Sequence, residues 1–201
     1  MTLLLVAGGF WQDEIDAESF WGRTGVLDGL RAHGEVLAPE RPRRARSWAA
    51  EGDFLANLVT EPVTVVAGSN GCSAAARFAV ARPQLVERLV LAWPATAHDP
   101  EVDGFTRDAL RELGADDDTV EALLGGGTLR GVGDDELRGL GMPVAVVPSE
   151  PENRMHQRYT VDAIKELTGA TELPGCPEPP MPAFQPDGFV HSVVQFGLSR
   201  A

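Results

Sequence analysis

The stretch from Val63 to Val80, VTVVAGSNGCSAAARFAV, passes from a β-branched run into an alanine-rich run through Gly-Ser-Asn-Gly. β-branched residues favour a strand and alanine favours a helix, so the chain must turn sharply around Ser69. A residue held at such a turn is strained, and its neighbours two positions away must be small, as Ala67 and Gly71 are. The Ser69 hydroxyl is then expected to project above a sheet edge, with a helix N-terminus behind it. An ordinary Gly/Ser/Asn turn is the alternative, and the small flanking residues favour the sharp turn.

Further apolar runs of strand length alternate with helical patterns along the chain. The runs are nearly continuous, as in strands that are buried on both faces. Strands and helices that alternate with short connections predict an α/β fold, a mostly parallel sheet with helices on both faces. The expected strands are Leu3–Ala7, Glu35–Ala38, Val63–Ala67, Arg88–Ala92 and Val144–Val147, and the expected helices are Phe20–Ala32, Ser47–Val59, Asn70–Ala81 and Tyr159–Leu167.

Residues 95–141 break this alternation. They show helical patterns at Val102–Leu113, Asp117–Leu124 and Asp134–Leu140 and no strand pattern. A helical insertion after the fourth strand would lie above the carboxyl ends of the strands, where open α/β sheets bind ligands. The sequence therefore predicts a core formed by 1–94 and 142–201 and a small helical lid formed by 95–141. The lid carries twelve acidic residues and four arginines, which predicts a solvated acidic surface.

Composition excludes several classes of function. The net charge of −13 argues against a nucleic-acid partner, because binding to phosphates needs a positive surface. The basic stretch ERPRRARSW, Glu40 to Trp48, is expected to be a solvated loop, with an anion site as the alternative. No apolar run is long enough to span a bilayer, and the first residues are typical of a strand and not of a signal peptide.

The two cysteines, Cys72 and Cys176, predict neither a disulfide framework nor a metal site. Together with the absence of a targeting signal, this favours a cytoplasmic location. We also expect a small-molecule substrate, no membrane partner and no cofactor.

With these features, the chain resembles the α/β-hydrolase family over nearly its whole length. LLLVAGGFW resembles the family's first core strand ending in His-Gly-x, with Gly8 in place of the usual histidine and Gly9 retained. The resemblance implies that the N–H groups of Phe10 and Asn70 hold an oxyanion. VERLVLAWPAT resembles the family's strand that follows the helix after the nucleophile, here the helix expected at Asn70–Ala81. The resemblance implies that Trp93 faces the substrate pocket. The first two strands of larger members are missing, so the resemblance is to a short version of the fold.

The tryptophans divide into two groups. Trp11 and Trp93 follow strand ends and are expected to line the pocket, whereas Trp21 and Trp48 are expected to pack helices onto the sheet.

The resemblance implies that a catalytic acid follows the strand in MPVAVVPSEPENRMH, where Glu152 is the expected residue. Glu150 and Asp99 are the alternative acids. Glutamate suits this role, because the acid only has to accept the imidazole N–H and stabilise the imidazolium.

The family's histidine follows its last strand, and here this chain departs from the pattern. LPGCPEPP carries Pro177, Glu178 and Pro179 where that histidine would stand. His191 in DGFVHSVVQFG is the only later histidine, and it lies in a helix for which Asp187 is the expected N-cap. A catalytic role and an ordinary helical position both remain open for it.

Three other histidines complete the set. His156 is the second candidate for the catalytic base, and His98 at the start of the lid also stays open. His33 precedes the second strand, at the wrong end of the sheet.

Two hypotheses follow. The first is a serine hydrolase that acts on an ester, thioester or lactone of a small apolar molecule, with Ser69 as nucleophile, His191 as base and Glu152 as acid. The second is a non-hydrolytic enzyme of this fold (a lyase, cyclase or isomerase) or a binding protein with an incomplete triad. The missing histidine after LPG and the glycine at position 8 motivate the second hypothesis.

Overall fold

The computed structural model describes residues 1–179 and 181–199, so that 180, 200 and 201 of the predicted core lie outside it. Its centre is one sheet of six parallel strands in the order β2-β1-β3-β4-β5-β6. The five predicted strands are all present, and the predicted α/β class is confirmed. The strands are β1 (Thr2–Val6), β2 (Glu35–Leu37), β3 (Val63–Gly68), β4 (Val86–Ala92), β5 (Val144–Val147) and β6 (Thr171–Glu172).

The sixth strand was not predicted. β6 has two residues, Thr171 and Glu172, which form no apolar run, and it pairs with β5 at the edge of the sheet. A strand this short and half exposed leaves no hydrophobic pattern to detect.

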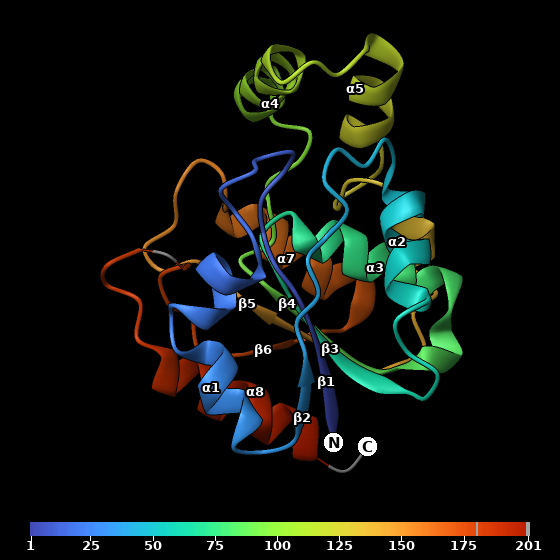
Figure 1. Ribbon diagram of the computed structural model, residues 1–201. Helices are drawn as coiled ribbons and strands as arrows, with labels where there is room; N and C mark the ends of the chain where they lie inside the picture. Colours follow the sequence, from blue (N-terminus) through green and yellow to red (C-terminus); the bar gives the residue numbers. More distant parts are fainter. Residues whose placement is uncertain (180, 200–201) are drawn as a thin grey trace.

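Helices cover both faces of the sheet (Figure 1). The π-helical turn η1 (Glu18–Gly22), α1 (Val26–Arg31) and α8 (Pro186–Leu198) pack on one face, and α2 (Trp48–Ala56), α3 (Gly71–Ala81) and α7 (Arg158–Thr168) on the other. Buried leucines and valines of β1, β3 and β4 alternate between these two cores. Strands buried on both faces explain the nearly continuous apolar runs in the sequence.

Two predicted helices have different bounds. The pattern Phe20–Ala32 is divided between η1 and α1, because Gly25 at φ +84° separates them. The last helix begins at Pro186 with Gln185 as its N-cap, so Asp187, the predicted N-cap, is instead the second residue of the helix. Proline at the first helical position suits this start, because it has no N–H to leave unpaired.

Residues 95–141 form α4 (Pro100–Glu112), α5 (Asp117–Leu124) and α6 (Asp134–Arg138). Figure 1 shows α4 and α5 beyond the carboxyl ends of the strands. The Nε1–H of Trp48 donates to the carbonyl of Leu123, 2.8 Å away, which joins α5 to α2. Val120, Leu123 and Leu137 of this segment belong to the same buried apolar cluster as Trp48, so the segment packs on the core.

Over residues 1–179 and 181–199, no helix has both the length and the apolar character needed to cross a bilayer.

Candidate active site

Ser69 follows β3 directly, at the carboxyl edge of the sheet. Its φ is +52°, in the left-handed region that residues with a side chain rarely adopt, so the predicted sharp turn is present. A Cβ at Gly71 would lie 2.5 Å from the carbonyl oxygen of Ala7, so only glycine lets α3 come this close to the end of β1. The sheet order changes direction between β1 and β3, which places Ser69 at the topological switch point, the usual ligand position in such sheets.

His156 is the histidine that contacts Ser69. Its Nε2 lies 2.9 Å from Ser69 Oγ, a hydrogen-bond distance, and its side chain is only 10% exposed. Thr96, in the segment after β4, holds the backbone on both sides of His156. Its N–H donates to the carbonyl of Met155, and its Oγ1 accepts from the N–H of Gln157. The nucleophile candidate and the imidazole are thus held by neighbouring elements of the sheet edge.

Glu178 lies on the other side of the imidazole. Its Oε1 is 3.3 Å from His156 Nδ1, accepts from Asn153 Nδ2 at 2.7 Å, and its Oε2 accepts from Ser149 Oγ at 2.5 Å. Burial raises the pKa of Glu178, but the nearby imidazole of His156 and the hydrogen bond from Ser149 outweigh it and bring the pKa down to about 2. The carboxylate is therefore charged at neutral pH and faces the ring nitrogen that is not turned to Ser69.

His191, the predicted base, is not brought to Ser69. It is exposed on α8 and borders two surface hollows, one with His33 and Gly29 and one with Cys176 and Pro177. Neither hollow is lined by Ser69, and no hydrogen bond joins His191 to Ser69 among the described residues. The sequence prediction was misled because α8 packs on α1 and runs along the face of the sheet.

Glu152, the predicted acid, also lies apart from the imidazole contact. It is exposed, and its carboxylate accepts from the Arg158 N–H at 2.8 Å, at the first residue of α7. Negative charge is favourable at a helix N-terminus, which explains this position. The alternative acid Asp99 accepts from two N–H groups at the start of α4, and His98 contacts the carbonyl oxygen of Gly126.

The positions of histidine and acid are exchanged relative to the resemblance described above. His156 follows β5, where the acid was expected, and Glu178 follows β6, where the histidine was expected. The chain order is serine, histidine, acid. The family order of serine, acid, histidine does not predict Glu178, because it places a histidine at this point of the chain.

The loop after β1 passes beside Ser69. A Cβ at Gly8 would meet Phe20 at 2.6 Å and Ser69 Cβ at 3.2 Å, which explains why the histidine common at this point is replaced by glycine. Gly9 has φ +85°. The N–H of Phe10, a predicted oxyanion donor, donates to Gln12 Oε1 at 3.2 Å. The second predicted donor, the N–H of Asn70, precedes α3 and has no acceptor among the residues that the structure describes.

Trp93 does not line a substrate pocket, contrary to the prediction. It is fully buried, stacks on Phe189 with ring centroids 4.9 Å apart, and its Nε1–H donates to the carbonyl of Cys176. The backbone at φ +49° turns the ring from the sheet edge into the core below. Trp11 is half-buried and lies under the Arg44 guanidinium. Trp21 and Trp48 pack in the two cores, as predicted.

Two arginines that the sequence did not single out are largely shielded from solvent near the site. Arg130 is 1% exposed; its guanidinium donates to the Asn70 side chain at 3.2 Å and to Asp103 of α4 at 2.8 Å. It therefore ties residues 95–141 to the residue after Ser69. Arg41 belongs to the predicted solvated loop but is 11% exposed and bonded to Glu51, so that prediction is wrong for this residue.

The comparisons with known structures agree with this fold. A meta-cleavage product hydrolase from Pseudomonas fluorescens aligns over 97% of this chain and 89% of its own, with 16% identity and a TM-score of 0.69. An extracellular α/β-hydrolase from a Paenibacillus species aligns over 99% and 100%, with 14% identity and a TM-score of 0.68. A serine hydrolase involved in carbazole degradation has 18% identity over 98% and 90%, with a TM-score of 0.69.

These likenesses define the class: the chain has the α/β-hydrolase fold. No protein-family model and no curated protein sequence matches it.

Proposed function

We propose that the protein is a serine hydrolase in which Ser69 is the nucleophile, His156 the base and Glu178 the acid. One observation carries the proposal: the imidazole of His156 lies 2.9 Å from Ser69 Oγ and 3.3 Å from the carboxylate of Glu178. A serine, an imidazole and a carboxylate in this relation are recognised as a triad by their geometry and not by their order in the chain.

The chemistry follows from these contacts. Ser69 Oγ attacks the substrate carbonyl carbon while its proton passes to His156 Nε2, and the carbonyl oxygen takes the negative charge. The ionised Glu178 stabilises the imidazolium. The N–H groups of Asn70 and Phe10 are placed to hold the oxyanion, once the substrate oxygen replaces Gln12 Oε1. His156 then gives its proton to the leaving group, and water, deprotonated by the same imidazole, releases the acid from Ser69.

The substrate class proposed is an ester, thioester or lactone of a small apolar molecule. Structural neighbours include a thioesterase domain from the curacin biosynthetic pathway, with a TM-score of 0.54 at 13% identity over 87% of this chain and 84% of its own. Residues 95–141 act in this proposal as a lid over the acyl pocket. The alternative of an incomplete triad lost its main support, because an imidazole does lie between Ser69 and a carboxylate.

The test is labelling with a fluorophosphonate, which phosphonylates an activated serine with loss of fluoride. We expect wild-type protein to be labelled at Ser69, and Ser69→Ala to be unlabelled and inactive on p-nitrophenyl esters. Absence of labelling in folded wild-type protein would rule out the hydrolase. The same holds if Ser69→Ala keeps its esterase activity.

A further inference from the structure

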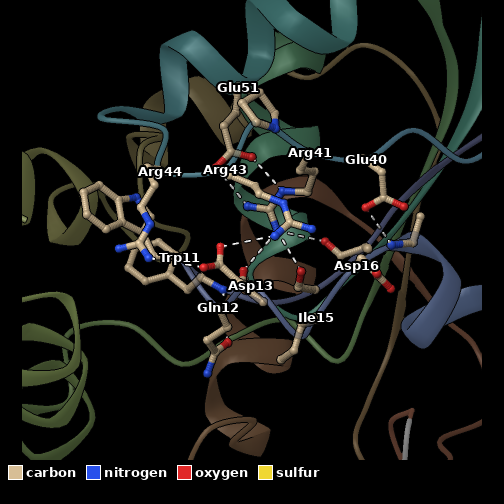
Figure 2. A pocket seen from close by; sticks show the side chains of 16 residues that line it. Trp11, Gln12, Asp13, Ile15, Asp16, Glu40, Arg41, Arg43, Arg44 and Glu51 are labelled. Atoms are coloured by element: carbon tan, nitrogen blue, oxygen red, sulfur yellow. Dashed lines mark hydrogen bonds and ion pairs between the residues drawn. The ribbon is translucent and has the colours of Figure 1, made fainter. Parts of the chain in front are cut away.

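The loop after β1 is held from behind by a single side chain, Arg41. Its Nη1 donates to three successive carbonyl oxygens, those of Ala7, Gly8 and Gly9, at 2.9, 3.0 and 3.0 Å. Figure 2 shows Arg41 at the centre of the cavity, with Glu51 beside it. Three consecutive carbonyl groups converge here on one cation.

The direction of the carbonyl groups fixes the direction of the N–H groups. In a trans peptide the C=O of one residue and the N–H of the next point in opposite directions. The amides of Gly8, Gly9 and Phe10 therefore point away from Arg41. Because the three carbonyl groups converge on Arg41, these N–H groups lie on the outer side of the turn that the chain makes at Gly9, where φ is +85°.

Two contacts relate this loop to the nucleophile and to an oxygen acceptor. Gly8 lies against Ser69, since a Cβ at Gly8 would be 3.2 Å from Ser69 Cβ. The N–H of Phe10 donates to an oxygen, Oε1 of Gln12, 3.2 Å away. The loop that Arg41 holds therefore adjoins Ser69 and carries an N–H group that already binds a carbonyl-type oxygen.

Glu51 fixes the guanidinium in turn. Its two carboxylate oxygens accept from Arg41 Nε at 2.7 Å and Nη2 at 2.9 Å, and the two side chains are 11% and 6% exposed. A two-point contact of this kind fixes the plane of the guanidinium, which a lysine cannot reproduce. Glu51 belongs to α2, so Arg41 connects the loop after β1 to a helix of the core.

The cavity beside Arg41 is not a substrate site. It measures about 40 Å³, room for water only, and its charged lining has one more carboxylate than arginine, with Arg41, Arg43 and Arg44 beside Asp13, Asp16, Glu40 and Glu51. A free anion would find no net positive charge there. The function of Arg41 must therefore lie in what it holds.

We infer that Arg41, fixed by Glu51, is a positioning residue that holds the loop after β1 so that the N–H of Phe10 serves as an oxyanion donor for Ser69. The cation also polarises these peptide groups, which strengthens the N–H donors on the other side. This inference rests on the proposed function for its catalytic consequence, but the arrangement of the loop can be tested without it.

The test compares Arg41→Lys with Arg43→Lys, a matched control two residues away whose side chain is 62% exposed. We expect Arg41→Lys to lower kcat and the rate of fluorophosphonate labelling by about 10- to 100-fold with KM within about twofold, because the oxyanion site acts mainly in the transition state. Arg43→Lys should match wild type in both. An Arg41→Lys protein that melts as wild type does and keeps at least half of kcat would overturn the inference.

Amide hydrogen exchange provides the readout that does not depend on activity. In Arg41→Lys the amide of Phe10, which is buried and hydrogen-bonded to Gln12, should exchange at least about tenfold faster, with those of Val65 and Val66 in β3 unchanged. Equal exchange at Phe10 overturns the inference even if the protein is no hydrolase. If Arg41→Lys does not fold, Glu51→Gln serves in its place and should change labelling and exchange in the same direction. Failure of wild-type protein to react with the fluorophosphonate would contradict the hydrolase proposal and leave the exchange result to decide on Arg41.

Discussion

Replacing Glu178 by glutamine removes one charge from the triad and changes little else. The remaining Oε1 can still accept from Asn153 and face His156, and the new amide can donate to Ser149 Oγ, whose own hydrogen can turn to the carbonyl of Pro151, 3.1 Å away. Each of these polar groups therefore keeps a hydrogen-bond partner in the variant. We therefore expect the melting temperature to change by only a few degrees.

The effect on activity follows from the distance of 3.3 Å between His156 Nδ1 and the Glu178 carboxylate. Two unit charges at this distance attract by about 5 kcal/mol at an effective dielectric constant of about 20. This attraction exists only when the imidazole is protonated, which happens in the transition state. Because solvation recovers part of it, we expect a loss of about 4 kcal/mol, which lowers kcat by about 10³-fold.

The assay is hydrolysis of p-nitrophenyl acetate, with thermal melting of the same samples. Glu152→Gln is the matched control, because Glu152 is the acid that the sequence predicted and its carboxylate contacts only the start of α7 among the described residues. It should keep kcat within about twofold. The reasoning fails if Glu178→Gln retains a tenth or more of kcat, or if Glu152→Gln is the variant that loses activity.

Three further outcomes are expected. His156→Gln should abolish fluorophosphonate labelling and His191→Gln should leave it unchanged, and labelling that depends on His191 instead would contradict the geometry. Gln12→Ala should raise the labelling rate by about two- to tenfold, because the Phe10 N–H loses an internal acceptor worth about 0.5–1.5 kcal/mol; a slower rate would mean that Gln12 assists binding. Hydrogen bonds from Arg158 and Lys165 lower the pKa of Glu172 from 4.5 to about 2, so its contribution to stability is present above pH 4.5 and is lost as the pH falls towards 2. With solvent screening this amounts to about 1 kcal/mol, and urea unfolding of Glu172→Gln should show a correspondingly weaker dependence on pH between 5 and 2.

The parts of the fold that the sequence predicted are those with a repeated local signal. β1, β3 and β4 are continuous apolar runs, and the turn at Ser69 is marked by small residues at fixed offsets. These signals arise from short-range sterics and from burial on both faces, which a single sequence records. The two-residue β6 depends on pairing with β5, and the sequence records nothing of that.

The partners of Ser69 depend on long-range packing. His156 is 87 positions away and Glu178 comes from a proline-rich loop, so no spacing rule links them to Ser69. The assumed order of residues directed attention to His191 and Glu152. The low exposure of Arg41 could not be predicted for a related reason. In a basic stretch, an arginine that is shielded from solvent has the same local sequence signal as its exposed neighbours.

The exchanged positions of His156 and Glu178 also affect how chains of this kind are recognised. A search pattern that requires serine, acid and histidine in that order does not find His156 and Glu178, or it selects a helical histidine such as His191. The pattern that describes this chain is a serine at the end of β3, a histidine nine residues beyond the last residue of β5 and a glutamate six residues beyond the last residue of β6. This alternative chain order of the same three residues should be sought in sequences that look incomplete by the usual pattern.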